Sequence, residues 1–139
     1  MSKHSTITTV HEGQMRCTTQ FGPSEALFST DIDTDLGGLG VFPRPGEMLA
    51  ASVASCMMSM IVYKAKGRGL GLEGIAIASS YHAGEHGIEK LCFDIRVPER
   101  ISDADRRVLE AAAKACPVGN ALRPEIEKCI TWRWADDPV

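Results

Sequence analysis

Apolar and polar residues alternate along several short segments of the chain, on both sides of one long apolar segment. Alternation with a period of two is typical of half-buried β-strands, and β-branched residues favour the same structure. The segments that read this way cover 5–10, 15–21, 26–32, 74–81, 88–97 and 129–134. The first three, separated by turns such as Gly22-Pro23, are predicted to form an antiparallel N-terminal sheet.

Residues 45–66 are predicted to form a long helix. Pro45 suits the first helical position, Glu47 suits the positive first turn, and Lys64 and Lys66 suit the last turn before a glycine. Its apolar residues are too dense for one amphipathic stripe, so we expect a central helix that is buried nearly all round.

A second helix is predicted to begin after Ser102, whose side chain suits the N-cap, and to run to Cys116. Pro117 then stops it. The predicted order is strands, a long helix, more strands, a second helix and a last strand. This order indicates an α+β fold, with antiparallel sheets around the buried helix. The 139 residues suit a single domain over 1–139.

Charge and length exclude several classes of partner. The chain has 15 basic and 18 acidic residues, a formal net charge of -3, and no long basic run, so we expect no nucleic acid partner. The N-terminus has no apolar core of signal-peptide length. The most apolar window, 48–63, contains three serines and falls short of the roughly 18 residues of a membrane span. We therefore expect a cytoplasmic protein without a membrane partner.

No metal site is expected either. Asp31, Asp33 and Asp35 begin like a calcium loop, but Leu36 stands where glycine is required and Phe42 where glutamate is required. These acids are interpreted as a solvated acidic turn.

The chain has five cysteines, an odd number, and none forms a CxxC pair. Cys17, Cys92 and Cys129 fall in predicted strands and are interpreted as structural. Cys56 stands inside the first predicted helix, and Cys116 stands at the end of the second. From the residues alone, each is either a small core thiol or a reactive one.

The surroundings of the last two cysteines carry a family resemblance. Gly37-Gly38 precedes PGEMLAASVASC at 45–56, and ACPV follows at 115–118, with Cys116 sixty positions after Cys56. Over about residues 5–135 this pattern resembles the OsmC/Ohr family of organic hydroperoxide reductases. The resemblance implies an intertwined homodimer around two central helices. It also implies that Cys56 is the peroxidatic thiol, that Cys116 resolves it, and that a dithiol such as a dihydrolipoyl group is the reductant. No metal, flavin or haem is expected.

The resemblance also implies an arginine that activates the peroxidatic thiol. The hydroperoxidase branches use an arginine of the N-terminal sheet, held by a glutamate directly after the helix-starting proline. Here Gly46 has that position and Glu47 follows it, so Glu47 is either the catalytic acid that holds the arginine or, as we favour, a charge that stabilises the first helical turn. Arg16 is the first candidate for the arginine and Arg44 the second, and these departures resemble the OsmC-like branch of the family.

The methionines after Cys56 leave two interpretations open. Met57 and Met60, with Met58 between them, could line an apolar substrate pocket or fill gaps at a helix contact.

The resemblance predicts a thiol-dependent peroxidase that reduces organic hydroperoxides to alcohols in oxidative stress defence. The alternative is a non-catalytic dimeric domain of the same fold that binds a small apolar or electrophilic ligand. A third hypothesis is another thiol enzyme, acting on a thioester or a disulfide.

Overall fold

The computed structural model describes residues 6–138, and within the chain two compact units are distinguished, residues 1–48 and 49–139. The boundary falls inside the long helix α1, and each unit is described by itself. The single domain over 1–139 stays a prediction. Residue 5, where the first strand is predicted to begin, lies outside the described residues.

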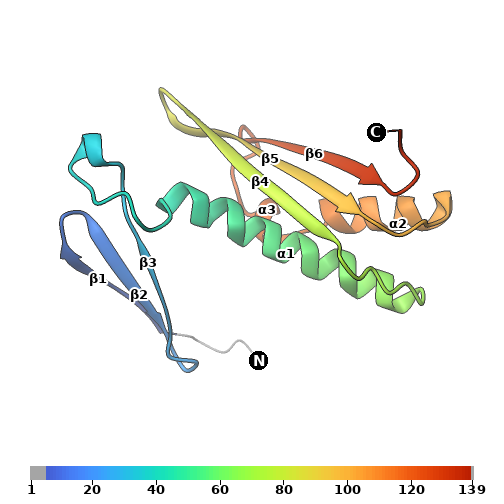
Figure 1. Cartoon of the computed structure of the whole chain (residues 1–139), viewed down its shortest axis with the longest axis horizontal. Coiled ribbons are helices and arrows are strands. Elements are labelled where there is room, and N and C mark those ends of the chain that lie inside the picture. The colour runs from blue at the N-terminus through green and yellow to red at the C-terminus, as the bar shows by residue number, and fades with distance from the viewer. Residues whose placement is uncertain (1–5, 139) are drawn as a thin grey trace. The chain divides into compact units, whose positions relative to one another are not determined.

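The N-terminal unit contains a three-stranded sheet in the order β1-β2-β3 (Figure 1). Its strands are β1 (Ile7–Gly13), β2 (Arg16–Phe21) and β3 (Ala26–Thr30), and both pairs are antiparallel, as predicted. The register sets Cys17 opposite Thr30. Arg16, the first residue of β2, therefore lies beside Asp31, the residue that follows β3. A single 3-10 turn, η1 (Thr34–Leu36), follows the sheet.

Helix α1 (Pro45–Gly67) begins at the predicted proline. The carbonyl of Arg44 accepts the first helical hydrogen bond, from Met48 N–H, and the Glu47 carboxylate accepts the Arg44 backbone N–H at 2.8 Å. A glutamate at the third helical position that accepts this N–H forms one half of a capping box. The start of α1 is therefore fixed by local chemistry.

The burial of α1 differs from the prediction of a helix buried all round. Its buried residues follow a single stripe, which consists of Ala50, Val53, Met57, Ile61 and Ala65. Val62 and Tyr63 remain 44% and 72% exposed, because the sheet of the C-terminal unit covers only one face of the helix. By length and composition α1 could also cross a membrane, a test that core helices of soluble proteins pass as well.

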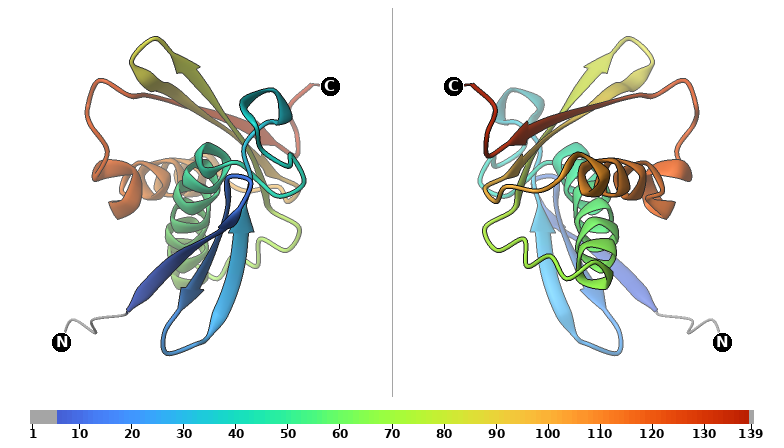
Figure 2. Two further views of the ribbon diagram at one scale, coloured as in Figure 1. Left: turned by 90° about the vertical axis from the view of Figure 1, so that its left-hand side faces the viewer. Right: turned by 90° about the vertical axis from the view of Figure 1, so that its right-hand side faces the viewer.

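The C-terminal unit contains a second three-stranded sheet in the order β4-β5-β6, with α1 and α2 on the same face of it (Figures 1 and 2). Its elements are β4 (Ala76–Gly84), β5 (Gly87–Val97), α2 (Asp103–Lys114) and β6 (Glu127–Trp134). The first pair is antiparallel, but β5 and β6 are parallel, so the prediction of purely antiparallel sheets is wrong. The physical reason is the helical crossover: α2 carries the chain back to the end at which β5 began.

The core of this unit lies between its sheet and the helices. Leu91, Phe93, Ile95 and Val97 alternate along β5 and are each at most 1% exposed, which confirms the predicted inward face. They form one apolar cluster with the α1 stripe and with Leu109 of α2.

The end of α2 also differs from the prediction. Ser102 caps the helix as expected, accepting Asp105 N–H at 3.2 Å, but α2 ends at Lys114. Pro117 then starts a short helix, α3 (Pro117–Asn120), with proline at its first position. Cys116 is therefore the N-cap of α3 rather than the last residue of α2.

Candidate functional site

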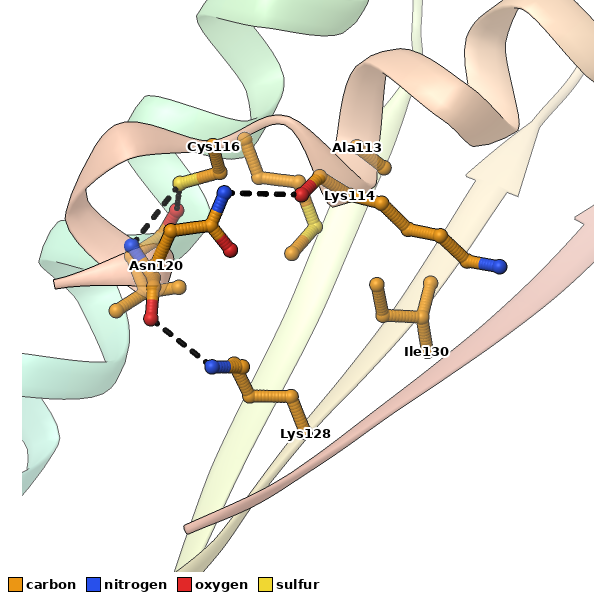
Figure 3. Close-up of a pocket in the computed structure, with 9 residues that line it drawn as sticks. Ala113, Lys114, Cys116, Asn120, Lys128 and Ile130 are labelled. Atoms are coloured by element: carbon orange, nitrogen blue, oxygen red, sulfur yellow. Dashed lines mark hydrogen bonds between the residues drawn. The ribbon is translucent and has the colours of Figure 1, made fainter. Parts of the chain in front are cut away.

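The Cys116 thiol is held between α3 and α1 in the core of the C-terminal unit. Its residue is 2% exposed. Gly119 N–H donates to Sγ at 3.4 Å, and the thiol donates to the Val53 carbonyl of α1 at 3.7 Å (Figure 3). The cap position thus determines where this sulfur points.

Cys56 lies less than one helical turn after Val53 on α1 and is half-buried. Its thiol is close enough to that of Cys116 to affect its ionisation. Burial raises the pKa of Cys116, the Gly119 N–H opposes the rise, and the neighbouring Cys56 thiol adds to it. The structure therefore brings these two cysteines together, both as free thiols, while their catalytic roles stay predictions.

A cavity of about 400 Å³ opens beside Cys116 (Figure 3). Its wall is mostly apolar, with three polar side chains, and consists of Val53, Met57, Ala113, Lys114, Cys116, Gly119, Asn120, Lys128 and Ile130. The Lys128 ammonium donates to the Gly119 carbonyl at 3.0 Å, which ties β6 to the short helix that carries Cys116. Met57 is in this wall, whereas Met60 is not, so a pocket role for Met60 stays a prediction.

Arg16 is bound by an acid that sequence reasoning did not assign to it. Its guanidinium forms two parallel bonds of 2.8 Å with the Asp31 carboxylate and lies 4.5 Å from the ring centroid of Phe42. Asp31 is 1% exposed and also accepts the backbone N–H groups of Val41 and Phe42. The Arg16 bonds, followed by these N–H bonds, hold the pKa of Asp31 well below its usual range.

One expectation about this region is therefore wrong. Asp31 is not part of a solvated acidic turn, although Asp33 and Asp35 are exposed. Asp31, and not an acid at the start of α1, holds Arg16. A correct prediction of the strand register would have identified the Arg16–Asp31 pair, because the register sets the start of β2 beside the end of β3.

Glu47 instead binds Arg44. Its carboxylate accepts the Arg44 backbone N–H and, at 3.2 Å, the Arg44 guanidinium. These bonds, the backbone one first, lower the pKa of Glu47. The geometry makes Glu47 a cap of α1, and a catalytic role for Glu47, Arg16 or Arg44 stays a prediction.

Among residues 6–138, no group of three or more histidine, cysteine or acidic side chains is arranged to hold a metal ion. The nucleophile in the wall of the cavity is the Cys116 thiol, beside the ammonium groups of Lys114 and Lys128. Two features define the class of protein. The first is an α+β fold with two small sheets, and the second is a pair of cysteines, one on the central helix α1 and one at the start of α3.

Comparison with known families identifies that class. The family model for OsmC-like proteins matches residues 37–128, about two thirds of the chain. The chain therefore belongs to the OsmC-like family. No match was found among proteins of curated function.

Solved structures with the same fold include organic hydroperoxide resistance proteins. A Psychrobacter arcticus protein named for osmotic stress and detoxification responses is 21% identical, with a TM-score of 0.89 over 96% of this chain and 98% of that one. The organic hydroperoxide resistance protein OsmC of Legionella pneumophila is 19% identical, with a TM-score of 0.74 over 94% and 96%. OhrB of Bacillus subtilis is 15% identical, with a TM-score of 0.69 over 94% and 98%. At these identities the likeness establishes the fold.

Proposed function

We propose that this protein is a thiol-dependent peroxidase that reduces organic hydroperoxides to alcohols. The observation that carries the proposal is that the Cys116 thiol contacts α1 at the Val53 carbonyl, less than one helical turn from Cys56, in a family that includes organic hydroperoxide resistance proteins. Reduction of a peroxide takes two electrons, and two thiols supply them when the sulfenic acid of one condenses with the other to a disulfide.

In the first step the Cys56 thiolate attacks the distal oxygen of the hydroperoxide. The O–O bond breaks, the sulfur is oxidised to a sulfenic acid, and the alkoxide leaves and takes up a proton to become the alcohol. Cys56 suits this role because it is half-buried, whereas Cys116 is almost fully enclosed.

In the second step the Cys116 sulfur attacks the Cys56 sulfenic acid, a disulfide forms, and water leaves. A raised pKa keeps the Cys116 thiol protonated at neutral pH. Because the thiolate is the nucleophile toward peroxides, this protonation protects Cys116 from direct oxidation. Its proton is then available to the departing hydroxide.

In the third step an external dithiol resets the pair by thiol–disulfide exchange, and its own two thiols become a disulfide. The cavity of about 400 Å³ borders Cys116 and offers a route for such a reductant to that sulfur. A dihydrolipoyl group is the reductant that the family resemblance favours.

The proposal includes a cytoplasmic homodimer that acts in oxidative stress defence. Support for a dimer comes from apolar side chains that the single chain leaves exposed: Ile7 and Leu27 in the N-terminal unit, and Val62 and Tyr63 on α1. A second copy would remove this surface from water.

Steady-state consumption of cumene hydroperoxide with dihydrolipoamide tests the proposal. The wild-type protein should turn over, Cys56→Ser should not, and Cys17→Ser should match the wild type, because Cys17 lies in β2. Turnover that survives Cys56→Ser would refute the assignment. No turnover in the folded wild type would favour the non-catalytic, ligand-binding alternative.

A further inference from the structure

Two cysteines outside the proposed active site form a second pair. Cys92 of β5 and Cys129 of β6 lie directly opposite each other in the parallel register, and both are free and half-buried. Cys92 alternates with the core residues of β5, so the pair occupies the sheet face that points away from the helices. The proposed peroxidase chemistry does not use either thiol.

The spacing of parallel strands disfavours a disulfide at this pair. In-register side chains of neighbouring strands stand about 4.7–4.9 Å apart. A disulfide needs Cβ atoms about 3.5–4.5 Å apart, and the sheet would have to contract to form one. Two sulfur atoms that share one metal ion need not be in bonding contact with each other, so the strand spacing does not oppose a shared ion.

Ion pairs on both sides hold the pair in register. Lys90 and Glu127 form one at 3.8 Å, and Asp94 and Arg133 form the other at 2.8 Å. From β4, His82 faces Lys90 and Ser80 faces Cys92. These are the charged and titratable groups that surround the two thiols on this face.

Both thiols are partly exposed, and Cys92 borders a hollow on the outer face of the sheet. A shallow hollow of about 240 Å³ on the sheet is lined by Cys92 together with Ser80, Asp94, Thr131 and Arg133. Burial raises the pKa of Cys92, and the neighbouring Cys129 thiol adds to the rise. Within residues 6–138 no third histidine, cysteine or acid joins the two thiols in a metal-binding group, so the protein supplies two ligands.

We propose that Cys92 and Cys129 form a second thiol site that binds a soft, two-coordinate metal cation. Thiolates select soft ions, and monovalent copper is the biological one that accepts two sulfur ligands. On binding, two S–H bonds break, two metal–sulfur bonds form, and two protons pass to solvent without electron transfer. The product carries one negative charge and lies between the Lys90–Glu127 and Asp94–Arg133 ion pairs.

The test uses the full-length protein with Cys56→Ser and Cys116→Ser, which removes the other thiol pair. Cu(I) is added without oxygen against bathocuproine disulfonate, a competing chelator, and native mass spectrometry counts the bound ions. We expect one ion per chain, and none after a further Cys92→Ser or Cys129→Ser. A further Cys17→Ser is the matched control and should keep the ion. The apparent affinity should rise with pH, because binding displaces two protons.

A second measurement uses only the protein with Cys56→Ser and Cys116→Ser. It therefore tests the proposal even if the variants with a further Cys92→Ser or Cys129→Ser do not fold. One equivalent of Cu(I) should protect Cys92 and Cys129 from iodoacetamide and leave Cys17 reactive in peptide mapping. Retention of the ion by either single-cysteine variant would overturn the proposal, and so would equal alkylation with and without copper.

Discussion

Replacing Cys116 with alanine should separate the two chemical steps of the proposed reaction. Cys56 would still attack the hydroperoxide, so one equivalent should convert it to a sulfenic acid. The disulfide could not form, because the variant lacks the thiol that lies beside Cys56. External dithiol would then have to reduce the sulfenic acid directly.

The size of the kinetic effect follows from proximity. A neighbouring thiol acts at an effective concentration of about 1 M, which is far below the maximum for well-oriented groups. Against about 1 mM external dithiol, the step after oxidation should slow by about 1000-fold. The cost to stability should be small by comparison. Removing one sulfur from a side chain that is 2% exposed should lower the free energy of unfolding by about 1–2 kcal/mol.

The assay combines intact-mass measurement with steady-state turnover. After one equivalent of cumene hydroperoxide, Cys116→Ala should gain about 16 Da, the mass of one oxygen, and react with dimedone at Cys56. Its turnover should fall to near background, while Cys17→Ala should behave like the wild type. Wild-type turnover in a folded Cys116→Ala protein would refute the resolving role.

Three further predictions concern stability. Asp31→Asn should lower the melting temperature at pH 7. The pKa of Asp31 is depressed, so its bond to Arg16 stabilises fully above about pH 4 and is lost as the pH falls further. The variant should therefore have a flatter pH dependence of Tm below pH 4, and an unchanged acid profile would contradict this. Glu47→Gln should lower the free energy of unfolding in urea by about 0.5–1 kcal/mol, because it weakens the cap on Arg44. A loss of turnover beyond what that change explains would instead support a catalytic Glu47. Because the pKa of Cys116 is raised, its thiol stabilises the fold fully below about pH 8.5 and progressively less above it. Thermal unfolding should thus show the wild type losing more stability than Cys116→Ala above that pH, and equal slopes would exclude this cause.

Local signals in the sequence predicted most of the elements. Proline at position 45 with Glu47 two residues later marked the start of α1, and Ser102 marked the start of α2. The period-two pattern of β5 identified its inward face. Each of these signals depends on neighbouring residues, so no tertiary information was needed.

The features that the sequence did not reveal depend on pairing between distant segments. The parallel partnership of β5 with β6 follows from the crossover through α2, and it alone brings Cys92 beside Cys129. The Arg16–Asp31 pair follows from the register of β2 with β3. A spacing rule along one chain segment cannot specify either.

The most direct test of the central claim is peptide mapping of the reduced wild-type protein after one equivalent of cumene hydroperoxide. The account predicts rapid formation of one Cys56–Cys116 disulfide, which is absent in Cys56→Ser. An unreacted pair, with Cys17, Cys92 and Cys129 oxidised slowly and at random, would contradict it.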